Sequence, residues 1–171
     1  MDSELTAGII TETEAYAGVV DRASHAYGGR LTPRTQVMFG KGGKAYVYLC
    51  YGIHSLFNVV TSVEGQPHAV LIRSIRPVEG IEVMRQRTGK AVITEKQGTG
   101  PGNVSRLLGI HYRHSGLSLY SKPEAGQDAI WIEDSGIQLR DEQIGSGPRV
   151  GVDYAGEDAQ LPYRFRLSLQ P

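Results

Sequence analysis

The sequence predicts an α+β fold: a single domain with a mostly antiparallel, curved sheet, a protruding β-hairpin and a few short helices. Three observations favour this class. Turn signals rich in glycine and proline recur along the 171 residues, short β-type runs lie between them, and only two stretches have the apolar spacing of a helix. Because the chain shows no repeat and no internal linker, residues 1–171 are expected to form one domain.

Six runs rich in β-branched and aromatic residues are predicted to be strands. They are Gly8 to Tyr16, Ala45 to Tyr51, Leu56 to Val63, Ala69 to Ile75, Ala129 to Glu133 and Tyr163 to Leu169. A glycine separates the second and third runs, so these are expected to form a hairpin with Tyr51, Ile53 and His54 around its tip. Large apolar groups at an exposed tip are costly unless they have a partner. Insertion between stacked bases is one use of such a tip. Packing of the hairpin over its own core is the alternative, which this stretch alone favours.

Two helices are expected. The stretch "RPVEGIEVMRQRTG" has Pro77 near its first position and an apolar stripe formed by Val78, Ile81 and Met84. Its acidic residues come early and its basic residues late, as the helix dipole favours. The stretch "GNVSRLLGI" predicts a shorter helix that is capped by Asn103 and ended by a glycine.

Composition indicates an ordinary soluble protein, with 40% hydrophobic and 21% charged residues. No apolar run reaches the roughly 18 residues of a membrane-spanning helix, and the first residues lack a secretory signal. We therefore expect no membrane partner and a cytoplasmic location. The single cysteine, Cys50, excludes an intramolecular disulfide and any cysteine-rich zinc or iron–sulfur site.

The net charge is zero, with 18 basic and 18 acidic residues, which argues against a strongly basic nucleic-acid-binding protein. The charges are unevenly distributed, however. Five cations and no acidic residue occur between Arg22 and Val63, so this part of the chain can meet a polyanion. The loop "RASHAYGGRLTPR" lies within it and offers side chains that donate hydrogen bonds to phosphates or bases. A chance imbalance and a solvated loop are the alternatives.

The stretch "TETEAY" places Glu12, Glu14 and Tyr16 on one side of the first strand, because strand side chains alternate between faces. Glutamate is a poor strand former, and like charges on one face repel. Either that face is solvated or one carboxylate serves chemistry. Arg73 interrupts the apolar run "AVLIRSI", so we expect Glu14 or Glu12 as its buried partner, or else an exposed position on an edge strand. A carboxylate, an arginine and several tyrosines suit hydrolysis at an anomeric carbon, one option among several.

Five stretches together resemble a known family. They are "ETEAY", "SHAYGGRLTPRTQVMF", "AYVYLCYGIHSLFNVV", "AVLIRSIRPVEG" and "PRVGVDYAGE". Their order and spacing, from about Gly8 to Phe165, resemble the alkyladenine (3-methyladenine) DNA glycosylase family. The resemblance implies a monofunctional base-excision repair enzyme that uses no metal or other cofactor. Such an enzyme flips an alkylated or deaminated purine (3-methyladenine, ethenoadenine or hypoxanthine) out of double-stranded DNA, hydrolyses its N-glycosidic bond and leaves an abasic site.

The resemblance also implies roles for single residues. Glu14 matches the glutamate that activates the attacking water, and Arg73 and the backbone carbonyl of Val150 match the groups that hold this water. For Glu12 no role follows beyond a structural one. The residues that match the family's base pocket are Tyr16, His25, Tyr48 and Asn58, of which Asn58 rejects ordinary guanine by crowding. The residues that match its DNA contacts are Tyr51, which fills the gap in the duplex, and Arg30, Thr32 and Arg34 at the DNA backbone.

The sequence departs from the family pattern at two places. Family members carry some tens of residues before the "ETEAY" strand, whereas here it follows "MDSELTAG". We therefore expect either a truncated start or a missing piece of the sheet, with an uncovered strand edge. Asn103 stands where the family commonly has a lysine, which removes one phosphate contact.

Several expectations complete this interpretation. The partner is double-stranded DNA that contains damaged purines, and the protein acts as a monomer, associated with the nucleoid if it is bacterial. Two alternatives stay open at this point: a nucleic-acid-binding module of the same fold that has lost catalysis, and a hydrolase of free nucleosides. Duplex binding without an abasic product would select the first, and an unchanged rate in Tyr51→Ala would select the second.

Overall fold

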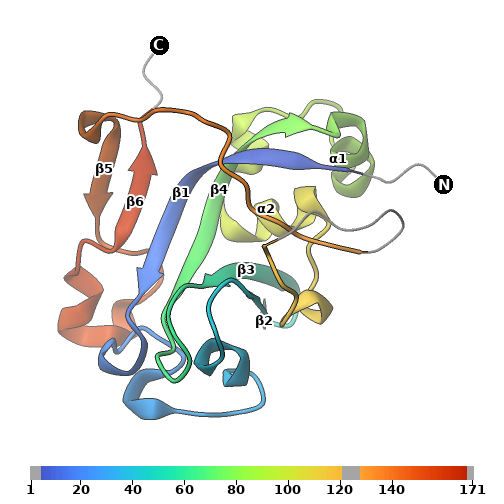
Figure 1. Ribbon diagram of the computed structural model, residues 1–171. Helices are drawn as coiled ribbons and strands as arrows, with labels where there is room; N and C mark the ends of the chain where they lie inside the picture. Colours follow the sequence, from blue (N-terminus) through green and yellow to red (C-terminus); the bar gives the residue numbers. More distant parts are fainter. Residues whose placement is uncertain (1–4, 121–127, 169–171) are drawn as a thin grey trace.

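The computed structural model describes residues 5–120 and 128–168 and has a six-stranded antiparallel sheet at its centre (Figure 1). The strands are β1 (Ala7–Tyr16), β2 (Ala45–Cys50), β3 (His54–Val60), β4 (Ala69–Glu79), β5 (Ile144–Gly147) and β6 (Arg164–Leu167). Their order across the sheet is β2-β3-β4-β1-β6-β5. The predicted α+β class is confirmed. β1 is an inner strand, because β4 and β6 pair with it on its two sides, and the edge strands of the sheet are β2 and β5.

Short helices connect and cover the strands. The α-helices are α1 (Ile81–Thr88) and α2 (Pro101–Leu108), which contact each other, and α2 packs on β3 and β4. The 3₁₀ helices of the described residues are Gly18–Val20, Tyr27–Gly29, Gln36–Phe39, Glu95–Gly98, Tyr112–His114, Asp141–Gln143 and Asp153–Gln160. Among the helices of the described residues, none has the length and apolar character needed to cross a bilayer.

The two faces of the sheet bury different groups, because side chains alternate along each strand. One face packs its apolar residues against α1 and α2, where Met84 and Leu107 are fully buried. On the other face, Tyr46 packs against Met38 and Ala26 from the long loop that follows β1. This second face is the one that carries the candidate site.

Five of the six predicted strands are found near their predicted bounds. The prediction for Ala129 to Glu133 is wrong, since these residues form no strand. The last predicted strand is shorter than expected and covers Arg164–Leu167, while Leu169 lies outside the described residues. β5 was not predicted, because its sequence "IGSG" has no apolar alternation; backbone pairing with β6 alone defines it.

Both predicted helices exist, but their starts differ from the prediction. Pro77 and Val78 belong to β4, and α1 begins only after Gly80, whose positive φ of 70° ends the strand. Pro77 is tolerated because it lies where the pairing of β4 with β1 becomes irregular near its end. Asn103 is not a cap. It lies inside α2, which begins at Pro101, and its side chain donates to the Thr99 carbonyl at 2.8 Å.

The β2–β3 hairpin projects its tip into solvent. The Tyr51 side chain is 93% exposed and Ile53 is 73% exposed, so the hairpin does not fold back over its own core. Tyr51 has a φ of 51°, a left-handed backbone conformation that costs energy in any residue with a Cβ. No other non-glycine residue among those that the structure describes has a positive φ. The tip thus presents an aromatic ring to solvent from a strained turn.

Candidate active site

Glu14 lies on the inner strand β1 and is completely buried. Three donors surround its carboxylate. The Tyr16 hydroxyl donates to Oε2 at 2.9 Å, the backbone N–H of Val150 donates to Oε1 at 2.7 Å, and Nε of Arg73 lies 3.5 Å from Oε1. These donors come from β1 itself, from the segment between β5 and β6, and from β4. Of the three residues predicted to be catalytic, Arg73 and Val150 therefore lie at the carboxylate of the third, Glu14, and Val150 does so through its N–H.

Glu12 is a second buried carboxylate and binds Arg73 more closely than Glu14 does. Its Oε1 accepts hydrogen bonds from Nε of Arg73 at 3.0 Å and from Nε of Arg164, and its Oε2 accepts the Ser74 hydroxyl at 3.0 Å. Burial raises the pKa of Glu12, but the hydrogen bonds from Arg164, Arg73 and Ser74 outweigh burial and hold the pKa below its ordinary value. The buried carboxylate partner predicted for Arg73 is confirmed, and the solvated-face interpretation is wrong.

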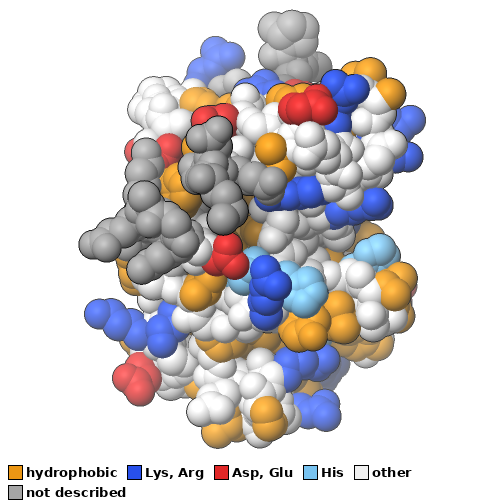
Figure 2. Space-filling view, turned by 90° about the vertical axis from the view of Figure 1, so that its right-hand side faces the viewer, with side chains coloured by type: hydrophobic (Ala, Val, Ile, Leu, Met, Phe, Trp, Pro, Cys, Tyr) orange, Lys and Arg blue, Asp and Glu red, His pale blue; other side chains and the backbone are white. Residues whose placement is uncertain are grey.

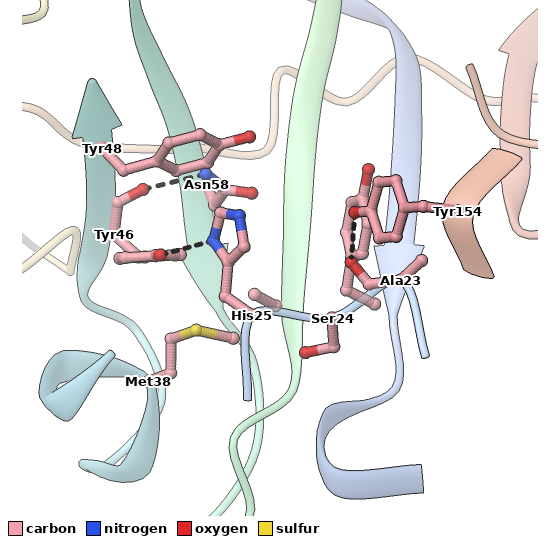
Figure 3. Close-up of a pocket in the computed structure, with 10 residues that line it drawn as sticks. Ala23, Ser24, His25, Met38, Tyr46, Tyr48, Asn58 and Tyr154 are labelled. Atoms are coloured by element: carbon pink, nitrogen blue, oxygen red, sulfur yellow. Dashed lines mark hydrogen bonds between the residues drawn. The ribbon is translucent and has the colours of Figure 1, made fainter. Parts of the chain in front are cut away.

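An aromatic pocket lies next to Tyr16 (Figure 3). Tyr46 and Tyr48 reach it from β2, Asn58 from β3 and His25 from the loop after β1. His25 Nδ1 lies 2.8 Å from the Tyr46 hydroxyl, and the His25 and Tyr48 rings meet edge to face with centroids 4.6 Å apart. The four residues predicted for the base pocket therefore line one cavity.

Burial keeps the ring side chains of this pocket uncharged near neutral pH. It lowers the pKa of His25 to about 4, with a smaller contribution from the positive charges of Arg34 and Arg30. Burial also raises the pKa of Tyr46 to about 12 and raises the pKa of Tyr48. The pocket thus offers hydrogen bonds and ring faces to a planar ligand and no ionised ring of its own.

Asn58 is fixed in the pocket wall by its own backbone surroundings. Its amide nitrogen donates to the carbonyl of Tyr46 at 3.0 Å (Figure 3). It also donates to the carbonyl of Leu56 at 3.2 Å. Both N–H groups are used in these bonds, so the side-chain oxygen is the polar atom that Asn58 can present to a ligand. A rigid amide at this place limits which ring substituents fit.

Sequence reasoning missed two parts of the site that flank Tyr16. Across the pocket, Tyr154 is 71% exposed and its hydroxyl donates to the Ala23 carbonyl at 3.1 Å (Figure 3). Behind Tyr16, the buried Arg149 pairs with Asp21 through both its terminal nitrogens, and its guanidinium carbon lies 4.9 Å from the Tyr16 ring centroid. Tyr154 and Arg149 both lie in "PRVGVDYAGE", where only the backbone of Val150 was singled out.

The predicted DNA-contacting residues lie outside the pocket, on the same loop and hairpin. Arg30 and Arg34 are exposed, and the Arg34 guanidinium lies 6.0 Å from the Tyr48 ring centroid. Thr32 differs, since its hydroxyl lies 3.0 Å from the Thr35 hydroxyl and helps to close the loop. In Figure 2, Lys and Arg side chains are spread over the view, and at the lower right they lie beside hydrophobic and His side chains with no acidic one among them, while acidic side chains lie mainly above and to the left.

The arrangement suits general-base chemistry on a ligand held in the aromatic pocket. A buried carboxylate with a fixed orientation can accept a proton from a water molecule, and the neighbouring arginine can orient that water. Among residues 5–120 and 128–168, His, Cys, Asp and Glu side chains form no group of three that could hold a metal ion.

Comparison with known proteins places this geometry in a family context. The family model for methylpurine-DNA glycosylase matches residues 1–171. A protein of Bacillus cereus strain G9842, provisionally named a 3-methyladenine DNA glycosylase, is 46% identical over an alignment that covers all of this chain and 84% of the relative. A protein of Bacillus thuringiensis strain Al Hakam with the same provisional name is 45% identical, with the same shares covered.

Proposed function

The chain belongs to the methylpurine-DNA glycosylase family, a family of DNA-repair glycosylases, and we propose that it excises alkylated or deaminated purines from double-stranded DNA. In this proposal the damaged base leaves the duplex, enters the aromatic pocket and is cut from its sugar by a water molecule that Glu14 activates. The products are the free base and an abasic site. 3-Methyladenine, ethenoadenine and hypoxanthine are the proposed substrates.

The observation that carries the proposal is the burial of Glu14 among oriented donors next to the pocket. In the proposed step, water loses a proton to Glu14 while its oxygen forms a bond to C1′ of the flipped nucleotide. The N-glycosidic bond breaks, and its electron pair leaves with the base. A cationic purine such as 3-methyladenine leaves as a neutral base, so a general base and a tight pocket suffice for it. A neutral base such as hypoxanthine or ethenoadenine takes the electron pair as an anion and gains a proton from solvent as it leaves.

Arg73 and Val150 are proposed to orient the attacking water. Arg73 lies within 3.5 Å of the Glu14 carboxylate, and Val150 bonds the same carboxylate through its N–H. The N–H bond places Val150 beside Glu14, and the backbone carbonyl of this residue is proposed to be the second group that holds the water.

The pocket and the hairpin support base flipping. Tyr16, His25 and Tyr48 line one cavity, in which the planar base is proposed to lie against their rings, and Asn58 is proposed to exclude guanine through its exocyclic amine. The exposed ring of Tyr51 is proposed to enter the duplex where the flipped nucleotide was, because a large apolar group at a solvent-exposed tip gains from stacking between bases. Arg30 and Arg34 are proposed to contact the DNA backbone.

Single-turnover cleavage of a duplex oligonucleotide with one ethenoadenine or hypoxanthine tests the proposal. The parent chain should yield an abasic site, and Glu14→Gln should slow excision by about 10²–10⁴-fold, the usual contribution of a general base, while duplex affinity is kept. Glu95→Gln is the matched control, because Glu95 is an exposed carboxylate that pairs with Arg76 at 3.7 Å.

Three results would overturn the proposal in different ways. Duplex binding without an abasic product from the folded parent would indicate a binding module. Equal cleavage of a free deoxynucleoside and of the duplex would indicate a nucleoside hydrolase. Full activity in Glu14→Gln would remove Glu14 from the mechanism.

A further inference from the structure

Glu12 has no part in the reaction proposed above, although its carboxylate, like that of Glu14, is buried and held by several hydrogen-bond donors. Glu12 is 8% exposed and accepts hydrogen bonds from Arg73, Ser74 and Arg164. A buried carboxylate with three donors differs from a surface charge, because its removal changes the charge balance of every group that shares those donors. The shared donor that reaches the active site is Arg73.

Arg73 lies between the two carboxylates. Its Nε is 3.0 Å from Oε1 of Glu12 and 3.5 Å from Oε1 of Glu14, so the stronger bond is made to Glu12. An arginine that paired fully with Glu14 would stabilise the ionised carboxylate and weaken it as a base. The same arginine, held mainly by Glu12, still lies close enough to Glu14 to contact a molecule bound there.

We propose that Glu12 is a positioning residue, which holds Arg73 beside Glu14 without letting the two pair fully, so that Glu14 can take a proton from water. This inference rests on the proposed function. It gives the first glutamate of "TETEAY" a role in the reaction that acts through Arg73 and involves no contact with the substrate.

The surroundings of both carboxylates define what else can influence them. Glu12 borders an open groove of the described structure to which β6 contributes Arg166 and the segment before α2 contributes Glu95. Glu14 faces Tyr16 and lies near Arg149, whose charge is balanced by its pairing with Asp21. The cations that touch Glu12 directly are Arg73 and Arg164, so these two decide how its charge is shared.

Two substitutions are expected to move the pH dependence of excision in opposite directions. Glu12→Gln removes a negative charge and releases Arg73 towards Glu14, and both effects favour the ionised form of Glu14. The acid limb of the single-turnover pH–rate profile should therefore move down by about 0.5–1 pH unit, and the plateau rate should fall about threefold because proton transfer follows base strength. Arg164→Gln removes a competing cation from Glu12, draws Arg73 towards Glu12, and should move the acid limb up.

Controls separate this role from a structural one. Glu95→Gln removes a carboxylate from the same groove without touching Arg73, and its acid limb should coincide with that of the parent. Circular dichroism at each pH restricts the comparison to the range in which all variants are folded, because acid unfolding of a destabilised variant would also move the acid limb. If Glu12→Gln does not fold, Arg164→Gln decides, because Glu12 keeps two of its donors in that variant.

The outcomes distinguish this inference from the function on which it rests. An active parent whose acid limb stays in place in Glu12→Gln and Arg164→Gln, or moves in the same direction in both, would overturn the positioning role alone. A parent that forms no abasic site, or whose activity survives Glu14→Gln, would overturn the proposed function and this role with it.

Discussion

Arg149 and Asp21 form an ion pair whose side chains are 0% and 1% exposed. Arg149 also donates to the carbonyls of Ala15 and Asp158, so it ties β1 to the segment that carries Val150. Arg149→Met should lower the free energy of unfolding by about 3–5 kcal/mol, because it leaves the Asp21 charge buried without its partner. Urea unfolding measures the change.

A surface pair provides the comparison for this prediction. Arg85→Met breaks the exposed Arg85–Glu82 pair and should change stability by less than about 0.5 kcal/mol. The double variant Asp21→Asn/Arg149→Met should recover part of the loss, since no unpaired charge then remains. Equal effects of Arg149→Met and Arg85→Met would contradict the structural role given to the buried pair.

His25 makes stability depend on pH in a defined window. Its pKa is lowered to about 4 by burial and by the nearby arginines, whereas an unfolded histidine titrates near its ordinary value of 6.5. Between pH 6.5 and about 4, His25 therefore binds a proton in the unfolded chain but stays neutral in the folded chain. The contribution of His25 to the free energy of unfolding is fully present above pH 6.5 and is lost as the pH falls towards 4. After allowance for solvent screening, this loss is about 2 kcal/mol.

Thermal or urea unfolding between pH 7 and pH 4 tests the histidine prediction. The parent should lose stability more steeply than His25→Asn, which has no titrating ring, and the two curves should differ in slope chiefly between pH 6.5 and 4. Acidic groups such as Asp21 contribute to both curves alike. Parallel curves would mean that His25 titrates normally in the folded state.

At the scale of elements, a substitution at the tip of the β2–β3 hairpin should raise stability and lower activity. Tyr51 is 93% exposed and has a φ of 51°, so Tyr51→Gly removes the ring and relieves backbone strain at once. The free energy of unfolding of this variant should rise by about 1 kcal/mol, because a residue with a Cβ costs about that much in the left-handed region. Excision from duplex DNA should nevertheless fall, because the proposed wedge is lost.

Comparison of two substrates isolates the wedge. Tyr51→Gly should lose at least about tenfold in kcat/KM on a damaged duplex, which corresponds to one base–aromatic stacking contact, and much less on a damaged single strand. Tyr51→Phe keeps the ring and should behave like the parent on both. Equal losses on the two substrates would indicate that Tyr51 acts on the pocket instead.

The elements also show where sequence reasoning succeeds and where it stops. Alternation along β1 to β4 predicts these strands, because each buries at least one face. The start of α1 was missed because the apolar spacing of Val78, Ile81 and Met84 continues across Gly80, whose backbone conformation, not its neighbours' hydrophobicity, separates β4 from the helix. Asn103 looked like a cap, but Pro101 at the first helical position decides the boundary.

Long-range contacts of the site could not be read from the residues themselves. Val150 bonds Glu14 across 136 positions and Arg149 bonds Asp21 across 128. Local patterns cannot specify such pairs, because they depend on how the sheet orders its strands. Arg73 is the exception, because a single arginine in an apolar run is expected to pair with a carboxylate. Glu12 and Glu14 were the two candidates in the sequence, and Arg73 contacts both.

At the scale of the whole molecule, the order of the strands brings the residues of the site together. The part of the chain that carries the pocket loop and the hairpin is net positive. β1 lies between β4 and β6, so Arg73 and Arg164 reach its carboxylates from both sides. The zero net charge hides a segment from Arg22 to Val63 that holds five cations and no acidic residue. That segment contains the His25 loop and the hairpin, and its Arg30 and Arg34 lie close enough to the aromatic pocket to lower the pKa of His25.

This asymmetry predicts how duplex binding responds to salt. Each phosphate contact adds about 0.9 to the slope of log K against log salt concentration. Arg30→Gln/Arg34→Gln should therefore lower that slope by about 2 and weaken binding to damaged and undamaged duplexes alike, since phosphate contacts carry no base information. Titration of a labelled duplex at several salt concentrations measures both quantities.

Arg140→Gln is the control for each single arginine of the salt experiment. It removes one positive charge, half the change made in the double variant, from the acidic C-terminal part of the chain, beside Asp141 and Glu142. It should leave the slope unchanged because repulsion keeps phosphates away from that region. If net charge alone governed binding, each neutralised arginine would change the slope equally wherever it lies. A full effect at Arg30 and Arg34 with none at Arg140 would instead mean that an electrically neutral protein binds DNA through the local field of one loop.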